Sequence, residues 1–375
     1  MTRTLLFDAM TTIKQKALRI RAWMRTYERY VVPIALVSGF VIDTQVFTRV
    51  DVLWNDLLLF GFIVAAAVGI TLFNMGEERI LRGWVTTAIA SAMPLVVQFA
   101  FGSLFKGLII FYGRSASLTS SWVFVFTLAA LLIFSEVFIN NYRRFRYQMV
   151  LLFLFVLLYN AFYLPVVLGS IGPVIFLLSI AVSLAMVGVF AFALGYIIPK
   201  RLAETRPFLI RAFLAIAAGF IILYALNVIP PLPLALKDEG VLHSLTRVGD
   251  TYQATYEQDP WYDWLPTYAP VFHEAPGDTV YIYTALFVPT KIRLTLKHEW
   301  QRYDTASKRW TTTDIVSFPV AGGRDGGYRG YSKKSGLAPG AWRVNVITDY
   351  GAIISRIDFS VEAVDTPVPV IEATY

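Results

Sequence analysis

The stretch that most constrains this protein is residues 149–198, MVLLFLFVLLYNAFYLPVVLGSIGPVIFLLSIAVSLAMVGVFAFALGYII, in which no side chain is charged. As a single α-helix it would be about 75 Å long, whereas the hydrocarbon core of a bilayer is about 30 Å thick. Pro165, Gly169, Gly172 and Pro173 interrupt its middle, where a helix breaks most readily. We therefore predict two membrane spans joined by a turn at residues 169–171.

Five further apolar stretches have the length of a membrane span, about 20 residues. The 375 residues are 56% apolar and 16% charged, with a mean hydropathy of +0.57, which excludes most soluble enzymes. This pattern predicts an α-helical polytopic membrane bundle of seven transmembrane helices within a domain of residues 30–230. The predicted spans are 30–48, 53–74, 84–105, 119–139, 149–168, 172–197 and 208–229. The third has the least definite end, because residues 107–112 either continue it or form a re-entrant or interfacial segment.

Basic residues are distributed unevenly between the two sides of these spans. One side holds only three of them, Arg49, Lys106 and Arg114. The side that carries the N-terminus holds sixteen: Arg3, Lys14, Lys16, Arg19, Arg21, Arg25, Arg29, Arg79, Arg82, Arg143, Arg144, Arg146, Lys200, Arg201, Arg206 and Arg211. Because basic loops stay in the cytoplasm, we predict a multi-pass protein of the cell inner (cytoplasmic) membrane. Its N-terminus would be cytoplasmic and its C-terminal domain periplasmic or extracellular. The basic amphipathic segment 1–29 is either a helix on the anionic inner leaflet or only a determinant of orientation.

The chain changes character after Pro230. Residues 1–230 hold 19 lysines and arginines against nine acidic residues, and residues 231–375 hold 14 against 17. We expect a juxtamembrane collar or linker at 231–278 and an extracytoplasmic domain at 279–375. In residues 291–303 apolar side chains alternate with polar ones, as in a half-buried strand. About six or seven such strands, separated by turns, predict an all-β antiparallel sandwich that is immunoglobulin-like.

Four short motifs connect this C-terminal part with a known family. They are His298-Glu299-Trp300, Arg329-Gly330-Tyr331-Ser332-Lys333, Gly340-Ala341-Trp342-Arg343-Val344, and Gly351 followed by Phe359-Ser360-Val361. On these motifs, residues 280–361 resemble the bacterial domain of unknown function 2914 family. The family is uncharacterised and often attached to membrane segments, so the resemblance implies neither an activity nor a ligand.

An aromatic segment is the first candidate for ligand binding. Its members are Trp261, Tyr262, Asp263, Trp264 and Tyr268. Such aromatic rings stack on sugars while a carboxylate accepts hydrogen bonds from hydroxyl groups. The alternative is that the rings pack the domain against the outer leaflet, where tryptophan and tyrosine are enriched.

A basic patch and a histidine-containing strand are further candidates. The patch consists of Arg324, Arg329, Lys333 and Lys334, of which Arg329 and Lys333 are the binding candidates. It either captures an anionic envelope polymer or lipid headgroup, or forms a solvated edge. His298 and Trp300 are also candidates for a ligand site, but they share the apolar face of one strand. We therefore expect His298 to be a core histidine that is hydrogen-bonded to the backbone or to a serine or threonine. Because the chain has no cysteine and no metal or cofactor motif, we predict neither a metal nor a cofactor and assign no catalytic residue.

Gln98, Asn160 and Tyr163 are the polar mid-span candidates for a membrane pathway. An amide inside a bundle more often bonds a neighbouring helix. The predicted function is a polytopic membrane protein that displays a binding, sensing or envelope-interaction module and is more a binding protein than an enzyme. The alternatives are a transporter or channel subunit, and a membrane enzyme acting on envelope lipid or glycan. The expected partners are the lipid bilayer and an envelope glycan, lipid or protein, and not nucleic acid, because the exported part is acidic.

Overall fold

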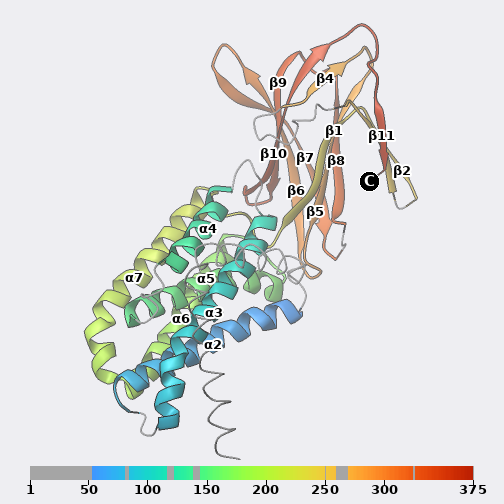
Figure 1. Ribbon diagram of the computed structural model, residues 1–375. Helices are drawn as coiled ribbons and strands as arrows, with labels where there is room; N and C mark the ends of the chain where they lie inside the picture. Colours follow the sequence, from blue (N-terminus) through green and yellow to red (C-terminus); the bar gives the residue numbers. More distant parts are fainter. Residues whose placement is uncertain are drawn as a thin grey trace, which may run out of the picture. The chain divides into compact units, whose positions relative to one another are not determined.

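The computed structural model describes residues 53–80, 84–115, 122–137, 144–249, 251–258, 269–323 and 326–374. All of them belong to one compact unit, Arg49–Tyr375. In these ranges, helices extend to Ala225 and strands begin at Ala235 (Figure 1). A helical part is therefore followed along the chain by a β part, in the order that the sequence predicts.

The described helices fit a membrane protein but not the predicted number of spans. Five helical segments are long and apolar enough to cross a membrane: α2, the part of α3 from Ala92, α5, α6 and α7. The predicted count of seven is not matched among the described residues, because residues 1–48 lie outside them and the described part of α4 has only 16 residues. The helices are α2 (Leu53–Glu77), α3 (Trp84–Ser115), α4 (Trp122–Val137), α5 (Phe145–Leu168), α6 (Pro173–Ile197) and α7 (Pro199–Ala225).

The break in the long apolar stretch lies where the sequence predicts it. Gly169 ends α5 with φ 64° and ψ 25°, a left-handed conformation that glycine adopts without a Cβ clash, and its amide donates to the carbonyl of Pro165. Pro173 then occupies the first turn of α6, where its missing N–H costs no hydrogen bond. In contrast, residues 107–112 simply continue α3, which runs to Ser115.

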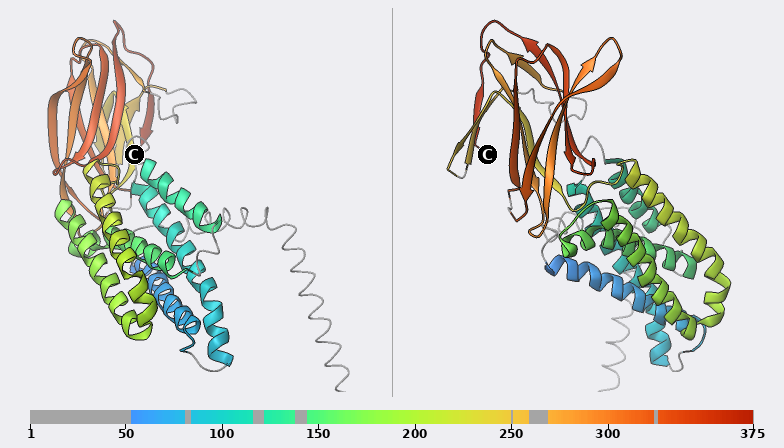
Figure 2. Two further views of the ribbon diagram at one scale, coloured as in Figure 1. Left: turned by 90° about the vertical axis from the view of Figure 1, so that its left-hand side faces the viewer. Right: turned by 180° about the vertical axis from the view of Figure 1, so that it is seen from behind.

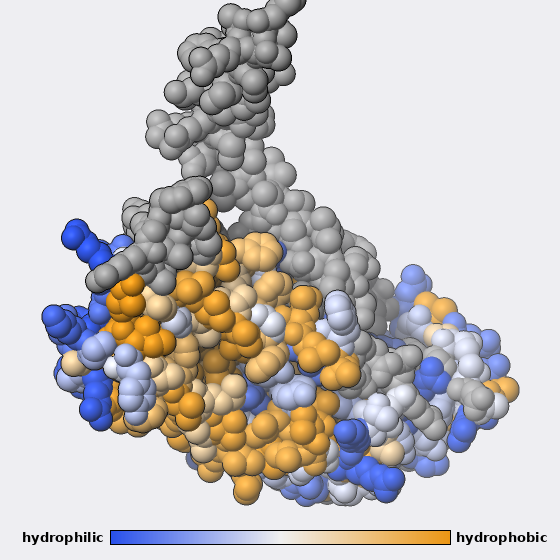
Figure 3. All heavy atoms as spheres, turned by 90° about the horizontal axis from the view of Figure 1, so that it is seen from below, coloured by the Kyte–Doolittle hydropathy of each residue, from blue (hydrophilic) through white to orange (hydrophobic). Residues whose placement is uncertain are grey.

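The helices carry a broad apolar surface. Val174, Val189 and Phe192 of α6, with Leu214 and Ile222 of α7, are among the large hydrophobic side chains that are exposed. Figure 3 shows hydrophobic residues gathered over a wide area, with hydrophilic residues at its margins. A patch of this extent is unfavourable in water and suits contact with lipid.

Eleven described strands form three sheets, with the strand orders β1-β5-β8, β4-β10-β9-β6-β7 and β11-β3-β2. All pairs are antiparallel except β4 with β10. The strands are β1 (Ala235–Leu242), β2 (Ser244–Val248), β3 (Thr251–Tyr256), β4 (Val271–Glu274), β5 (Thr279–Phe287), β6 (Arg293–Asp304), β7 (Arg309–Ala321), β8 (Tyr328–Ser335), β9 (Gly340–Thr348), β10 (Ile353–Ala363) and β11 (Ile371–Thr374).

The first two sheets share one apolar core. Figure 2 shows the strands of the β part from two further sides. Strand β6 alternates strictly between buried and more exposed residues from Leu294 to Trp300, as its sequence predicts. Opposite it, β5 contributes Val280, Ile282 and Leu286. The C-terminal part is thus a sandwich of mainly antiparallel sheets, held by apolar burial between its layers.

Within the predicted collar, the described residues form strands β1, β2, β3 and β4 of this β part. β1 pairs with β5 from Ala235↔Phe287 to Leu242↔Tyr281, and β4 pairs with β10. The sequence of β1, ALKDEGVL, gives little sign of a strand because three charged residues and a glycine break the apolar alternation. Pairing with β5, which is far along the chain, determines its conformation.

Gly322, just after β7, provides a test of this packing. A Cβ atom built there would lie 1.9 Å from the carbonyl oxygen of Pro289, so Gly322→Ala must move backbone. We expect it to lower the free energy of unfolding by about 1–3 kcal/mol or more, measured by thermal unfolding of the purified full-length protein in detergent. Gly240→Ala is the matched control, because its Cβ would first meet Leu242 at an ordinary 3.5 Å. Equal melting temperatures for the two variants would contradict the packing described.

Candidate functional site

The aromatic candidates Trp261, Tyr262, Asp263, Trp264 and Tyr268 lie outside the described residues. Their proposed contact with sugars, and the alternative contact with the membrane, both stay predictions. Strand β3 ends shortly before this segment and β4 begins shortly after it. The segment therefore connects the β11-β3-β2 sheet to the edge of the five-stranded sheet.

His298 and Trp300 lie on β6 inside the core and are 0% and 1% exposed. The Nδ1 atom of His298 is 2.8 Å from the Ser332 hydroxyl, and its Nε2 atom is 3.1 Å from the Thr284 hydroxyl. The Trp300 indole N–H donates to the same Ser332 oxygen at 3.0 Å, which leaves the serine proton available for Nδ1. His298 is thus the hydrogen-bonded core histidine that its position in the strand predicts, and it supports β5 and β8 from within.

Burial controls the protonation of His298. The apolar surroundings disfavour the charged imidazolium and lower the pKa of His298 from 6.5 to about 4. The side chain is therefore neutral at physiological pH. Protonating it in place would bury a charge among Phe318, Trp300 and the hydroxyls that now satisfy its ring nitrogens.

Arg329 and Lys333 lie on the same outward face of β8. Tyr331, which is exposed, lies between them on that face. The Lys333 ammonium lies 5.8 Å from the centre of the Tyr281 ring. Lys334 points to the other face and forms an ion pair with Asp314 of β7. The structure thus places Arg329 and Lys333 on one face of β8, while their role in binding an anion stays a prediction.

A carboxylate held between two histidines is the site that sequence reasoning missed. The two oxygens of Glu257 lie 2.9 Å from Nε2 of His243 and 2.6 Å from Nδ1 of His273, and the backbone N–H of His273 donates to Glu257 at 2.7 Å. The His243 ring also stacks on Phe272, with ring centres 4.1 Å apart. The cluster ties the segments that precede β2, follow β3 and form β4 into one unit.

Hydrogen bonding controls the charge of Glu257. Partial burial by itself raises the pKa of this carboxyl, but the His273 backbone amide and the two imidazoles outweigh burial and lower the pKa below its ordinary value. Two more carboxylates stand close by: Asp278, 3.8 Å from Nδ1 of His243, and Glu362, 3.9 Å from Nε2 of His273. The described part of the chain nevertheless holds no group of side chains suited to a metal ion.

The membrane candidates do not form one cluster by any contact that the structure shows. The Asn160 amide of α5 donates to the Ser183 hydroxyl of α6 at 2.9 Å, the interhelical bond typical of an amide in a bundle. Tyr163 stacks on Tyr159 of its own helix, with ring centres 5.1 Å apart. Gln98 is half-buried on α3. Their role in a pathway stays a prediction.

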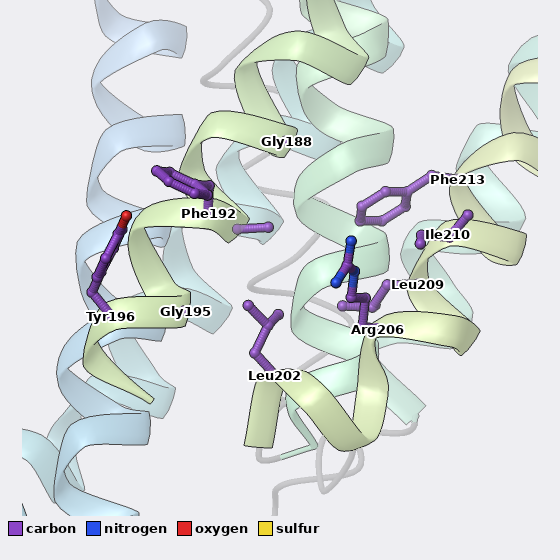
Figure 4. A pocket seen from close by; sticks show the side chains of 10 residues that line it. Gly188, Phe192, Gly195, Tyr196, Leu202, Arg206, Leu209, Ile210 and Phe213 are labelled. Carbon is purple, nitrogen blue, oxygen red and sulfur yellow. The ribbon is translucent and has the colours of Figure 1, made fainter. Parts of the chain in front are cut away.

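A groove of about 710 Å³ lies between the facing ends of α6 and α7 (Figure 4). It exists partly because Gly188 and Gly195 present no side chain toward α7. Leu202 and Phe213 supply apolar walls, and the Arg206 side chain reaches into the groove. A mainly apolar groove with one cation suits the chain of a lipid more than a polar solute.

Comparison with known proteins identifies only the C-terminal part. Residues 294–361 match a family described as "Protein of unknown function (DUF2914)". This match confirms the resemblance drawn from the motifs. No curated protein matches the chain.

One solved structure aligns with most of the chain, but its structural similarity to the chain is low. It is "Pseudomonas fluorescens alkylpurine DNA glycosylase AlkC bound to DNA containing an abasic site analog", with 9% identity over 82% of this chain and 99% of that chain. Its TM-score of 0.21 is too low to indicate a common fold.

The buried histidine predicts a pH dependence of stability. The unfolded chain takes up a proton on His298 near pH 6.5 and the folded chain only near pH 4, so the unfolded state binds more protons between these values. Lowering the pH from 6.5 to 4 should therefore cost about 3 kcal/mol of unfolding free energy. The lowered pKa of Glu257 adds a further loss below its ordinary value of 4.5.

Denaturant titrations of the full-length protein at pH 7 and pH 5 measure this effect. His298→Gln should remove most of the loss between these pH values. Ser332→Ala is the control: it removes a hydrogen-bond partner and lowers stability at both pH values, but it keeps the histidine and hence the pH dependence. The same pH dependence in His298→Gln and wild type would show that another group is responsible.

Proposed function

We propose that this protein is a multi-pass membrane protein that holds its C-terminal β-sandwich on the outer side of the membrane, where the sandwich binds a protein partner of the cell envelope. The uneven distribution of lysine and arginine supports this orientation. The five helices long enough to cross a membrane support the anchoring role. An immunoglobulin-like topology and an inner-membrane location belong to the same proposal.

The joint between the helices and the sandwich supports a firmly held module. Ile171, in the turn between α5 and α6, packs against the sandwich core. In the same turn, a Cβ on Gly169 would lie 3.1 Å from the carbonyl oxygen of Lys291, and one on Gly172 would contact the Tyr350 ring at 3.6 Å. Burial at this joint raises the pKa of Tyr350. The sandwich is therefore held by packing at this turn as well as by its covalent connection after α7.

The edge strand β7 carries the proposal of protein binding. It is 13 residues long and pairs only with β6, so its outer backbone edge faces away from the sheet. Nearly all its side chains are exposed, and these include Ile315 at 56% and Val316 at 36%. An unpaired strand edge readily pairs with another chain, and the exposed Ile315 and Val316 would add apolar contacts there. An extended segment of a partner would add to this edge and satisfy its backbone groups.

Site-specific photocrosslinking in intact cells tests this surface. With a photoreactive residue at Thr311 of β7, we expect adducts with another protein. Ile315→Lys in the same chain should reduce their yield about tenfold, because lysine on an edge strand opposes pairing. Thr246→Lys, on the exposed face of β2, is the matched control and should leave the yield unchanged.

Two results would contradict this assignment. One is a yield from Thr311 no higher than from exposed Asp365 outside the sheets. The other is an equal loss of adducts in Ile315→Lys and Thr246→Lys. Either result would remove β7 as the binding edge.

Reporter fusions after Thr374 test the orientation separately. A phosphatase that is active only outside the cytoplasm should be active there, and a fluorescent protein that folds only in the cytoplasm should not be. The physical reason is retention of the basic loops on the inner side. The opposite result would place the β-sandwich in the cytoplasm and overturn the proposed function.

A further inference from the structure

Three arginines from two helices meet at one end of the helical bundle. Helices α5, α6 and α7 follow one another through short turns, so the N-termini of α5 and α7 lie at the same end. A hollow of about 620 Å³ opens between them and is lined by Arg144, Arg146 and Arg201. Of the described acidic residues, only Glu204 lines it.

A buried amide holds Arg201 in place. The Nη1 atom of Arg201 donates to Oδ1 of Asn74 at 2.6 Å, and Asn74 is 0% exposed. The Asn74 amide nitrogen donates in turn to Oε1 of Gln148 at 3.0 Å and to the carbonyl of Ile70 at 2.7 Å. Because the Asn74 side chain already makes these hydrogen bonds, the Arg201 guanidinium is oriented before any ligand binds.

The other two cations lie at the start of α5. The guanidinium carbon of Arg146 lies 5.3 Å from the centre of the Phe208 ring of α7, a cation–π contact that directs it across the hollow. Arg144 precedes the first residue of α5 and is exposed. Glu77 lies near Arg201, with Oε2 3.8 Å from Nη2. Three cations thus face two carboxylates, Glu77 and Glu204, and the hollow keeps a net positive charge.

The position of the hollow along the helices indicates what it binds. Arg144 adjoins the start of the candidate span Phe145–Leu168, and the hollow also has apolar walls from Val150 and Phe208. An occupant must therefore combine an anionic group with an apolar part. We propose that this hollow binds the phosphate headgroup of an anionic phospholipid, with the arginines as donors and the acyl chains against the apolar wall. This site is independent of the partner proposed for β7.

Lipid titration of the purified full-length protein in detergent tests the site. Native mass spectrometry measures the bound fraction with phosphatidylglycerol, with phosphatidylcholine and with phosphatidylglycerol in the presence of inorganic phosphate. We expect half-saturation by phosphatidylglycerol at a concentration about tenfold lower than by phosphatidylcholine, with no competition by millimolar phosphate. The double variant Arg144→Gln/Arg146→Gln should abolish the preference. Lys200→Gln, an exposed lysine of α7 that does not line the hollow, should keep it.

A second variant keeps the test decisive if the double variant fails to fold. Arg201→Lys keeps the charge but loses the planar guanidinium, and should weaken phosphatidylglycerol binding several-fold. An unchanged preference in both arginine variants would overturn the proposal. Equal loss in Lys200→Gln would show attraction by overall charge instead of a site, and displacement by inorganic phosphate would show a simple anion site. Both results would also overturn it.

Discussion

The break at residues 169–172 is the constraint on which the remaining structure depends. In an apolar environment every backbone polar group needs an internal partner, so a long uncharged stretch stays helical until glycine and proline allow a tight turn. Gly169 and Pro173 provide such a turn. Because α5 and α6 are thereby antiparallel, the N-termini of α5 and α7 come to one end of the bundle. The turn itself meets the sandwich through Ile171 at the other end.

Polar side chains in the bundle follow the same requirement. Asn160 bonds Ser183, and Asn74 bonds Gln148 and Arg201, so each amide links two or more helices. Such bonds are favourable because the alternative in a low-dielectric interior is an unsatisfied polar group. In the second case the network ends on the guanidinium of Arg201, at one end of the helical bundle. One chain of hydrogen bonds thus satisfies the buried amides of Asn74 and Gln148 and also holds the guanidinium of Arg201 in place.

The β part contains two histidine environments with opposite consequences. His298 is enclosed by the core and is kept neutral by burial. His243 and His273 lie nearer the surface and share the carboxylate of Glu257, whose pKa their hydrogen bonds lower. The first stabilises the contact between the two main sheets, and the second joins segments that surround β3 and β4. Both ring nitrogens of His298 have hydroxyl partners inside the core.

The sequence by itself determined the apolar helices, the break after α5, most strands of the sandwich and the core position of His298, because each follows from local periodicity or from glycine and proline. It did not determine that β1 joins the sandwich, since β1 depends on pairing with distant β5. The Glu257 cluster and the arginine hollow also came only from the tertiary structure. His243 and Glu257 are 14 residues apart in the chain, and Asn74 and Arg201 are 127 apart. Only folding brings such separated side chains within hydrogen-bond distance.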